Sequence, residues 1–78
     1  MKFITFMAIC VDICIENNNN ILKILLYDYI KLRLTKSQLF LFYMKVASID
    51  KESKMYKLMN KWINKNSNIL IKQFLYEK

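Results

Sequence analysis

The 78-residue chain contains no glycine, no proline and no histidine. Glycine is the usual residue where the backbone needs a positive φ angle or must approach a ligand closely, so a Gly-rich phosphate-binding loop is excluded. Histidine is the commonest general base and the commonest metal ligand, and its absence removes both uses. These absences argue against an enzyme. We expect no catalytic residues, no cofactor, no bound metal and no small-molecule substrate.

Cysteine is scarce, with only Cys10 and Cys14, which would share one face of a helix. The chain lacks the additional Cys or His ligands of a zinc site, and the spacing differs from the C-x-x-C redox motif. Free cysteine is among the most buried residue types, so we expect both side chains in the core.

Acidic residues are also few: six Asp and Glu stand against thirteen Lys and Arg, for a net charge of +7. The excess lies after residue 22, because the first 22 residues hold one lysine against Asp12 and Glu16. Asp12 and Glu16 are four residues apart and could form an acid–base pair, but no third group is present to orient them. A basic surface suits an acidic protein, phosphates or anionic lipids. Arg33 is the only arginine, so binding to nucleic acid would be non-specific and salt-dependent.

The first residues resemble a minimal signal peptide, with Lys2 followed by an apolar run from Phe3 to Val11. Asp12 ends this run, no clear A-x-A cleavage site follows, and the run is too short to span a bilayer. We therefore expect the segment to be the first core element of an intracellular, cytoplasmic protein. Secretion is the alternative, if residues 1–16 are a signal peptide.

Large apolar side chains are abundant: Ile, Leu, Phe, Met and Trp account for 32 of the 78 residues. A chain of this length forms one domain at most and buries only about 60% of the surface that its unfolded form exposes. We expect a single domain over residues 1–78 with part of its apolar surface exposed, which is typical of contact with a partner.

The first half of the chain predicts two elements joined by an asparagine turn. Residues 3–16 are apolar almost throughout, which fits a buried helix or a buried strand. Asn17–Asn20 tolerates turns and left-handed backbone and predicts the connector. Asn20 is then the N-cap of a helix over residues 21–34.

The middle of the chain allows two interpretations. Thr35 and Gln38 have the spacing of a capping box, which predicts a helix start. That helix would place Leu39, Phe42, Tyr43 and Val46 on one face. The alternative is a hairpin near residues 29–46 with Thr35–Gln38 as its turn, although the turn lacks Asn-Gly or Asp-Gly.

The last third predicts one helix and a break. Ser48 and Asp50 are both candidate caps for a helix that runs to about Lys65. Asn66–Asn68 predicts a break or strong bend, followed by a short last helix.

We therefore predict an all-α fold, a small bundle of four or five short helices. The alternative is an α+β fold with strands near residues 3–14, 29–34 and 39–46. The predicted core contains Phe6, Ile9, Ile13, Leu25, Tyr29, Phe42, Met59 and Trp62.

Residues 51–65 combine a basic face with an apolar face, because on a helix their lysines fall within about 120° of one another. The basic face consists of Lys51, Lys54, Lys57, Lys61 and Lys65. The apolar face consists of Met55, Leu58, Met59, Trp62 and Ile63. Four interpretations of this helix remain. In the first, the lysines are solvated and the apolar side chains belong to the core. In the other three, the helix contacts another protein, a phosphate backbone or an anionic membrane.

The stretch Ile13–Tyr29 resembles the helix-turn-helix part of an asparagine-rich ankyrin repeat, and Ala47–Trp62 overlies it at a 34-residue offset. This resemblance implies a protein-binding module. The T-P-L-H motif and the glycines of ankyrin repeats are missing, so we do not assign the chain to that family.

We expect a non-enzymatic protein–protein interaction or assembly subunit. Its apolar face would contact a protein partner or a second copy, and its basic face would steer the encounter. One alternative is a sequence-independent nucleic-acid-binding protein that uses the same lysines. A second is a secreted or membrane-surface peptide.

Overall fold

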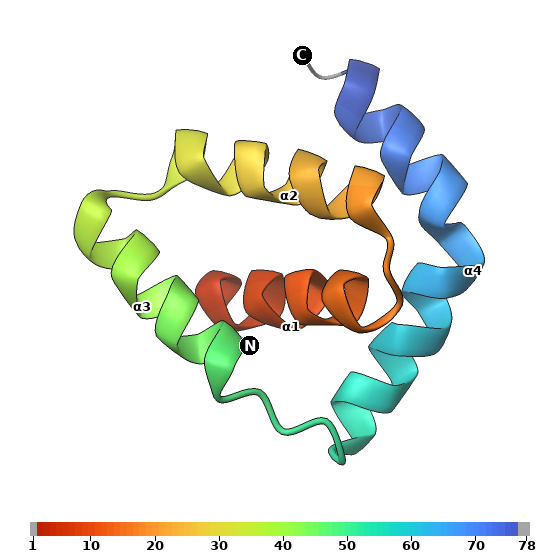
Figure 1. Ribbon diagram of the computed structural model, residues 1–78, viewed down its shortest axis with the longest axis horizontal. Coiled ribbons are helices and arrows are strands. Elements are labelled where there is room, and N and C mark those ends of the chain that lie inside the picture. The colour runs from red at the N-terminus through yellow and green to blue at the C-terminus, as the bar shows by residue number, and fades with distance from the viewer. Residues whose placement is uncertain (1, 77–78) are drawn as a thin grey trace.

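The computed structural model describes residues 2–76, and within this range it contains four helices and no strand (Figure 1). The helices are α1 (Phe3–Glu16), α2 (Asn20–Arg33), α3 (Lys36–Ala47) and α4 (Lys54–Tyr76). The all-α prediction is therefore confirmed. The α+β alternative is wrong, because its hairpin residues 29–46 lie in α2, in α3 and in the short link between them.

Helix α1 lies in the middle of the molecule, and the other three helices all pack against it (Figure 1). α2 runs antiparallel beside α1, while α3 and α4 flank this pair at opposite ends. With neighbours on several sides, α1 buries every residue from Met7 to Cys14. A helix surrounded in this way is apolar all round, which explains why periodicity did not separate helix from strand in residues 3–16.

The asparagine run forms the turn between α1 and α2, as predicted. Asn18 has a φ angle of 55°, in the left-handed region that asparagine tolerates better than most residues. Asn19, and not Asn20, is the N-cap: its side-chain oxygen accepts a hydrogen bond from the Leu22 amide at 3.3 Å. The predicted cap is wrong by one residue, since Asn20 already has helical geometry.

The capping box at the start of α3 is confirmed. The Thr35 hydroxyl accepts from the Gln38 amide at 3.2 Å, and the Gln38 side chain accepts from the Thr35 amide at 3.0 Å. Two backbone donors that the helix itself leaves unpaired are satisfied in this way.

The predicted start of the next helix is wrong. α4 begins at Lys54, and the hydroxyl of Ser53 accepts from the Tyr56 amide at 3.1 Å in the manner of an N-cap. Ser48 instead follows the last residue of α3, and the Asp50 carboxylate accepts from the Glu52 amide at 3.0 Å within the loop. Ser48 therefore ends α3 and Asp50 stabilises a turn in the loop, so neither residue caps α4.

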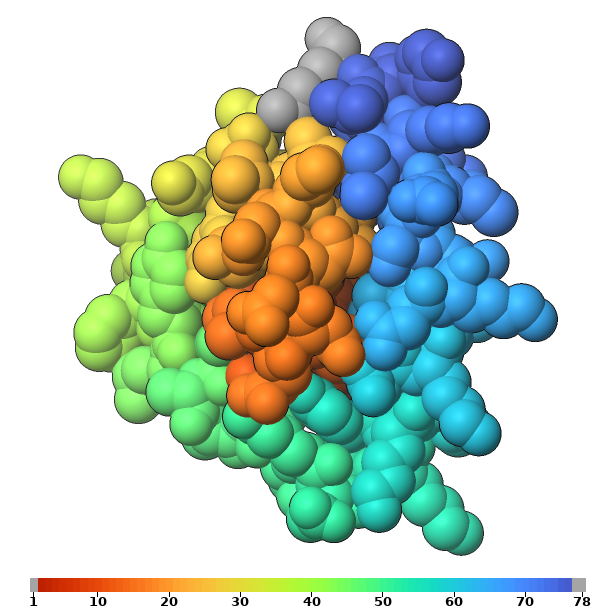
Figure 2. All heavy atoms as spheres, turned by 45° about the vertical axis from the view of Figure 1, so that its right-hand side comes forward, coloured from red at the N-terminus to blue at the C-terminus, as the bar shows by residue number. Residues whose placement is uncertain are grey.

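The predicted break at residues 66–68 is also wrong, since α4 is a single helix of 23 residues that passes through this segment and forms one side of the molecule (Figure 2). The polar side chains bond along their own helix: Asn66 donates to the Trp62 carbonyl at 2.8 Å, and Ser67 to the Ile63 carbonyl at 2.7 Å. Neither α4 nor any other helix within residues 2–76 is long and apolar enough to cross a bilayer.

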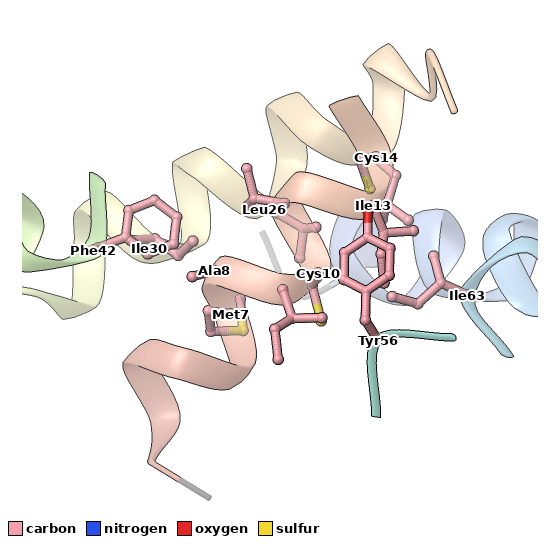
Figure 3. Packing of buried hydrophobic residues seen from close by; sticks show 13 residues of the cluster. Met7, Ala8, Cys10, Ile13, Cys14, Leu26, Ile30, Phe42, Tyr56 and Ile63 are labelled. Carbon is pink, nitrogen blue, oxygen red and sulfur yellow. The ribbon is translucent and has the colours of Figure 1, made fainter. Parts of the chain in front are cut away.

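The core gathers around α1 (Figure 3). Ile30 and Phe42 lie near Met7 and Ala8 at one end of the cluster, and Tyr56 and Ile63 lie near Ile13 at the other. Four predicted core residues are buried, namely Ile9, Ile13, Leu25 and Phe42, and two are partly buried, namely Tyr29 and Met59. The prediction is wrong for Phe6 and Trp62, which are 44% and 55% exposed.

Candidate functional site

An apolar groove lies between α1 and α4 and has a volume of about 490 Å³. α4 contributes Leu58, Met59, Trp62 and Ile63, whereas α1 contributes Phe6 and Cys10. Leu58 and Trp62 are 66% and 55% exposed, so they stand at the rim, while Ile63 is only 3% exposed. The groove thus has an open apolar rim above a buried floor.

A second hollow of about 140 Å³ adjoins the groove. The two share Phe6, Cys10, Trp62 and Ile63, and the second hollow is also lined by apolar side chains of α2 and of the second half of α4. Because every lining residue is apolar, the site can seat hydrocarbon or aromatic groups but offers no side chain for acid–base chemistry.

Four of the five predicted apolar-face residues line this groove; Met55 does not, although it is 47% exposed. Phe6 and Cys10 were not predicted as part of the surface. They come from a helix more than forty residues away in the sequence, and no local pattern links them to α4.

The predicted basic face divides into two groups. Lys51 precedes α4 and bonds to Glu16, and Lys57 forms an ion pair with Glu52 at 3.6 Å. The remaining three, Lys54, Lys61 and Lys65, are exposed and form no ion pair within residues 2–76.

Because α4 continues past residue 65, Lys72 falls on the same side of the helix as these three lysines. It is exposed and also forms no ion pair within the described residues. Continuing the helical spacing across residues 66–68 would have identified it. We name Lys54, Lys61, Lys65 and Lys72 the lysine row.

The carboxylate pair of α1 joins α1 to the start of α4. The Tyr56 hydroxyl donates to Asp12 Oδ2 at 2.9 Å, and Lys51 Nζ lies 4.0 Å from the same oxygen while it bonds to Glu16. Burial and then the hydrogen bond to Asp12 raise the pKa of Tyr56. The hydrogen bond to Glu16 raises the pKa of Lys51, more than its slight burial lowers it. Asp12 and Glu16 are therefore both bonded to residues at or just before the start of α4, and these contacts hold α4 against α1.

The two cysteines are buried and unbonded, in agreement with the predicted core role. Burial, and then the neighbouring Cys14, raises the pKa of Cys10 to about 12, and burial raises the pKa of Cys14 to about 11. At neutral pH both therefore stay as thiols, which are poor nucleophiles and poor metal ligands.

Within residues 2–76, no three cysteine, aspartate or glutamate side chains gather closely enough to hold a metal ion. The apolar groove and the lysine row thus share helix α4. Comparisons with protein-family models, with curated proteins and with solved structures found no match for this chain.

Proposed function

We propose that this chain is a non-enzymatic protein–protein interaction subunit that contacts its partner through the groove between α1 and α4. The observation that carries the proposal is the exposed rim of Phe6, Leu58 and Trp62. Other large apolar side chains, such as Leu32 and Phe40, are also exposed, but these three line one hollow together, which suggests a second role for them. Tryptophan is also among the residues that dominate binding energy at protein interfaces.

Sequence-independent binding of nucleic acid is supported less well. The lysine row suits phosphates, but that function leaves the neighbouring groove without a role. The single guanidinium, that of Arg33, lies 4.6 Å from the centre of the Tyr29 ring at the end of α2. Arg33 is therefore not part of the row.

A matched pair of leucines tests the proposal. Leu58 lines the groove, whereas Leu41 is 51% exposed on α3, at the opposite end of the molecule (Figure 1). Tagged whole chain, its Leu58→Asp variant and its Leu41→Asp variant are used for affinity capture from the native host, and direct binding of each retained protein is then measured after purification. We expect a partner that the unchanged chain and Leu41→Asp bind equally and that Leu58→Asp loses.

Two results would overturn this function: a set of bound proteins that is the same for all three chains, or retention of nucleic acid alone, removed by nuclease. Circular dichroism of each variant verifies that it is folded, so loss of binding is not loss of structure.

We also propose that residues 1–16 are retained and that the chain acts in the cytoplasm. α1 supplies eight consecutive buried residues at the centre of the core, so a chain without it would lose most of its packing. Mass spectrometry of the protein from its native source tests this. A mature chain that begins after Glu16 would contradict it and would favour a secreted peptide.

A further inference from the structure

The shape of the groove limits what can fill it. The floor includes Cys10 and Ile63, which are 8% and 3% exposed, and the adjoining second hollow extends the apolar space between α1, α2 and α4. A recess of this kind is filled by large apolar side chains that project from the partner. Helices present such anchors at positions i, i+3 or i+4, and i+7, and they bind in apolar grooves.

Every charged side chain on α4 is a lysine, and these lysines extend from Lys54 to Lys72, past the groove. On an ideal helix the lysine row spans about 27 Å in length and lies within about 40° around the axis, next to Leu58. Figure 2 shows long side chains that extend from α4 away from the body of the molecule. No carboxylate within residues 2–76 neutralises the row, so an acidic partner would complement it.

A second copy of this chain is a poor occupant. Each copy carries a net charge of +7 and its own lysine row, so two copies would repel each other. Asp12, Glu16 and Glu52 are already engaged with Lys51, Tyr56 or Lys57. An anionic bilayer has the complementary charge, but its flat surface would leave the buried floor of the groove unfilled.

We infer that the groove binds an acidic amphipathic helix of a partner protein. Apolar side chains of that helix fill the groove at Trp62 and Leu58, and its carboxylates lie along the lysine row. This inference rests on the proposed function and adds the chemistry of the partner.

Trp62 is the only tryptophan and lines the groove, so its fluorescence reports directly on the site. The probes are three peptides of about 18 residues, which match the length of the row. They are built of Glu and Ala with Leu, Met or Phe as the apolar anchors, and each has an analogue with every Glu replaced by Gln. We expect the acidic peptides to shift the Trp62 emission to shorter wavelength, and the Gln analogues to bind at least about tenfold more weakly.

Charge reversal on the protein gives the matching test. The double variant Lys61→Glu/Lys65→Glu changes the lysine row, whereas Lys31→Glu/Lys36→Glu changes the net charge equally at exposed positions on α2 and α3. We expect the first to weaken binding of the acidic peptides about tenfold, and the second to stay within about twofold of the unchanged chain. Binding should also weaken as salt is raised.

The outcomes separate the two proposals. If no acidic peptide binds, or if acidic and Gln peptides bind equally, the inference is overturned, while the Leu58→Asp capture experiment still decides the proposed function. A shift of Trp62 emission with vesicles containing phosphatidylserine, together with no shift for any peptide, would overturn the inference in favour of a lipid surface. If a captured partner is lost with Leu58→Asp but binds the Lys61→Glu/Lys65→Glu variant as well as the unchanged chain, the proposed function is supported and the acidic helix is overturned.

Discussion

Asp12 is the one charged side chain that is buried among the described residues, at 6% exposure. A buried carboxylate is stable only when it is paired or hydrogen-bonded. Here the Tyr56 hydroxyl supplies the hydrogen bond and Lys51 supplies the nearest positive charge. Because these partners are about forty residues from Asp12 in the sequence, the network fixes the loop before α4 and the first turn of α4 against α1.

Removing the Tyr56 hydroxyl should therefore cost more than removing a surface hydroxyl. We expect Tyr56→Phe to lower the free energy of unfolding by about 1–3 kcal/mol, since the Asp12 carboxylate loses the buried hydrogen bond from the Tyr56 hydroxyl. Tyr76→Phe on the same helix is the control, because Tyr76 is 87% exposed and its change should be nearly neutral. Urea unfolding followed by circular dichroism measures both. Equal stabilities would show that the hydrogen bond contributes nothing.

The buried thiols predict a loss of stability in alkaline solution. The pKa values of Cys10 and Cys14 are raised from 9.0 to about 12 and about 11, both mainly by burial. Well below pH 9 the thiols are protonated in both the folded and the unfolded state. Between about pH 9 and pH 11 only the unfolded chain loses these protons, so the free energy of unfolding falls as pH rises.

The double variant Cys10→Ala/Cys14→Ala isolates this contribution from those of Tyr56 and Lys51, whose pKa values are also raised. Its free energy of unfolding should decline less steeply with pH over the same range, measured by urea unfolding under reducing conditions. A slope identical to that of the unchanged chain would contradict burial of the thiols.

At the scale of elements, local signals predicted some boundaries and failed at others. The capping box of Thr35 and Gln38 and the left-handed backbone of Asn18 depend on neighbouring residues, so the sequence contains the information they need. The continuity of α4 depends on distant contacts. Leu70 and Phe74 pack against the core, and Asn19, in the turn between α1 and α2, donates to Ser67 of α4 at 3.1 Å. Local propensity cannot register such contacts.

The continuity of α4 can be tested at Asn68, which is exposed inside the helix. In a helix interior alanine is favoured over glycine by about 1 kcal/mol. We therefore expect Asn68→Ala to be more stable than Asn68→Gly by about this amount in thermal or urea unfolding. If residues 66–68 were a break, glycine would be equal or better.

The same two substitutions should have the opposite order at Asn18, in the turn between α1 and α2. Its φ angle of 55° is costly for alanine by about 1–2 kcal/mol, and glycine adopts it freely. Asn18→Gly should therefore be more stable than Asn18→Ala in the same assay. The reverse order would mean that the turn has another backbone conformation.

At the scale of the whole molecule, the groove exists because α4 contacts α1 through only part of its surface. Ile63 faces the core, while Trp62, its neighbour in sequence, stands at the rim. The sequence showed that α4 has an apolar side and a basic side, but not how far the apolar side extends beyond what α1 and α2 cover. That extent depends on the crossing of helices far apart in the chain, so the partners of Phe6 and Trp62 could not be predicted locally.

Because one part of the apolar side of α4 is buried and another part is exposed at the groove, we expect stability and binding to depend on different residues of this helix. Ile63→Ala removes a side chain that is 3% exposed and should lower the free energy of unfolding by about 2–5 kcal/mol. Leu58→Asp replaces a side chain that is 66% exposed and should change it by no more than about 0.5 kcal/mol, while it abolishes binding to the partner. Urea unfolding and Trp62 fluorescence measured on the same samples compare the two effects. If Leu58→Asp destabilised the fold as much as Ile63→Ala does, the rim would belong to the core, and the exposed apolar surface would no longer point to a partner.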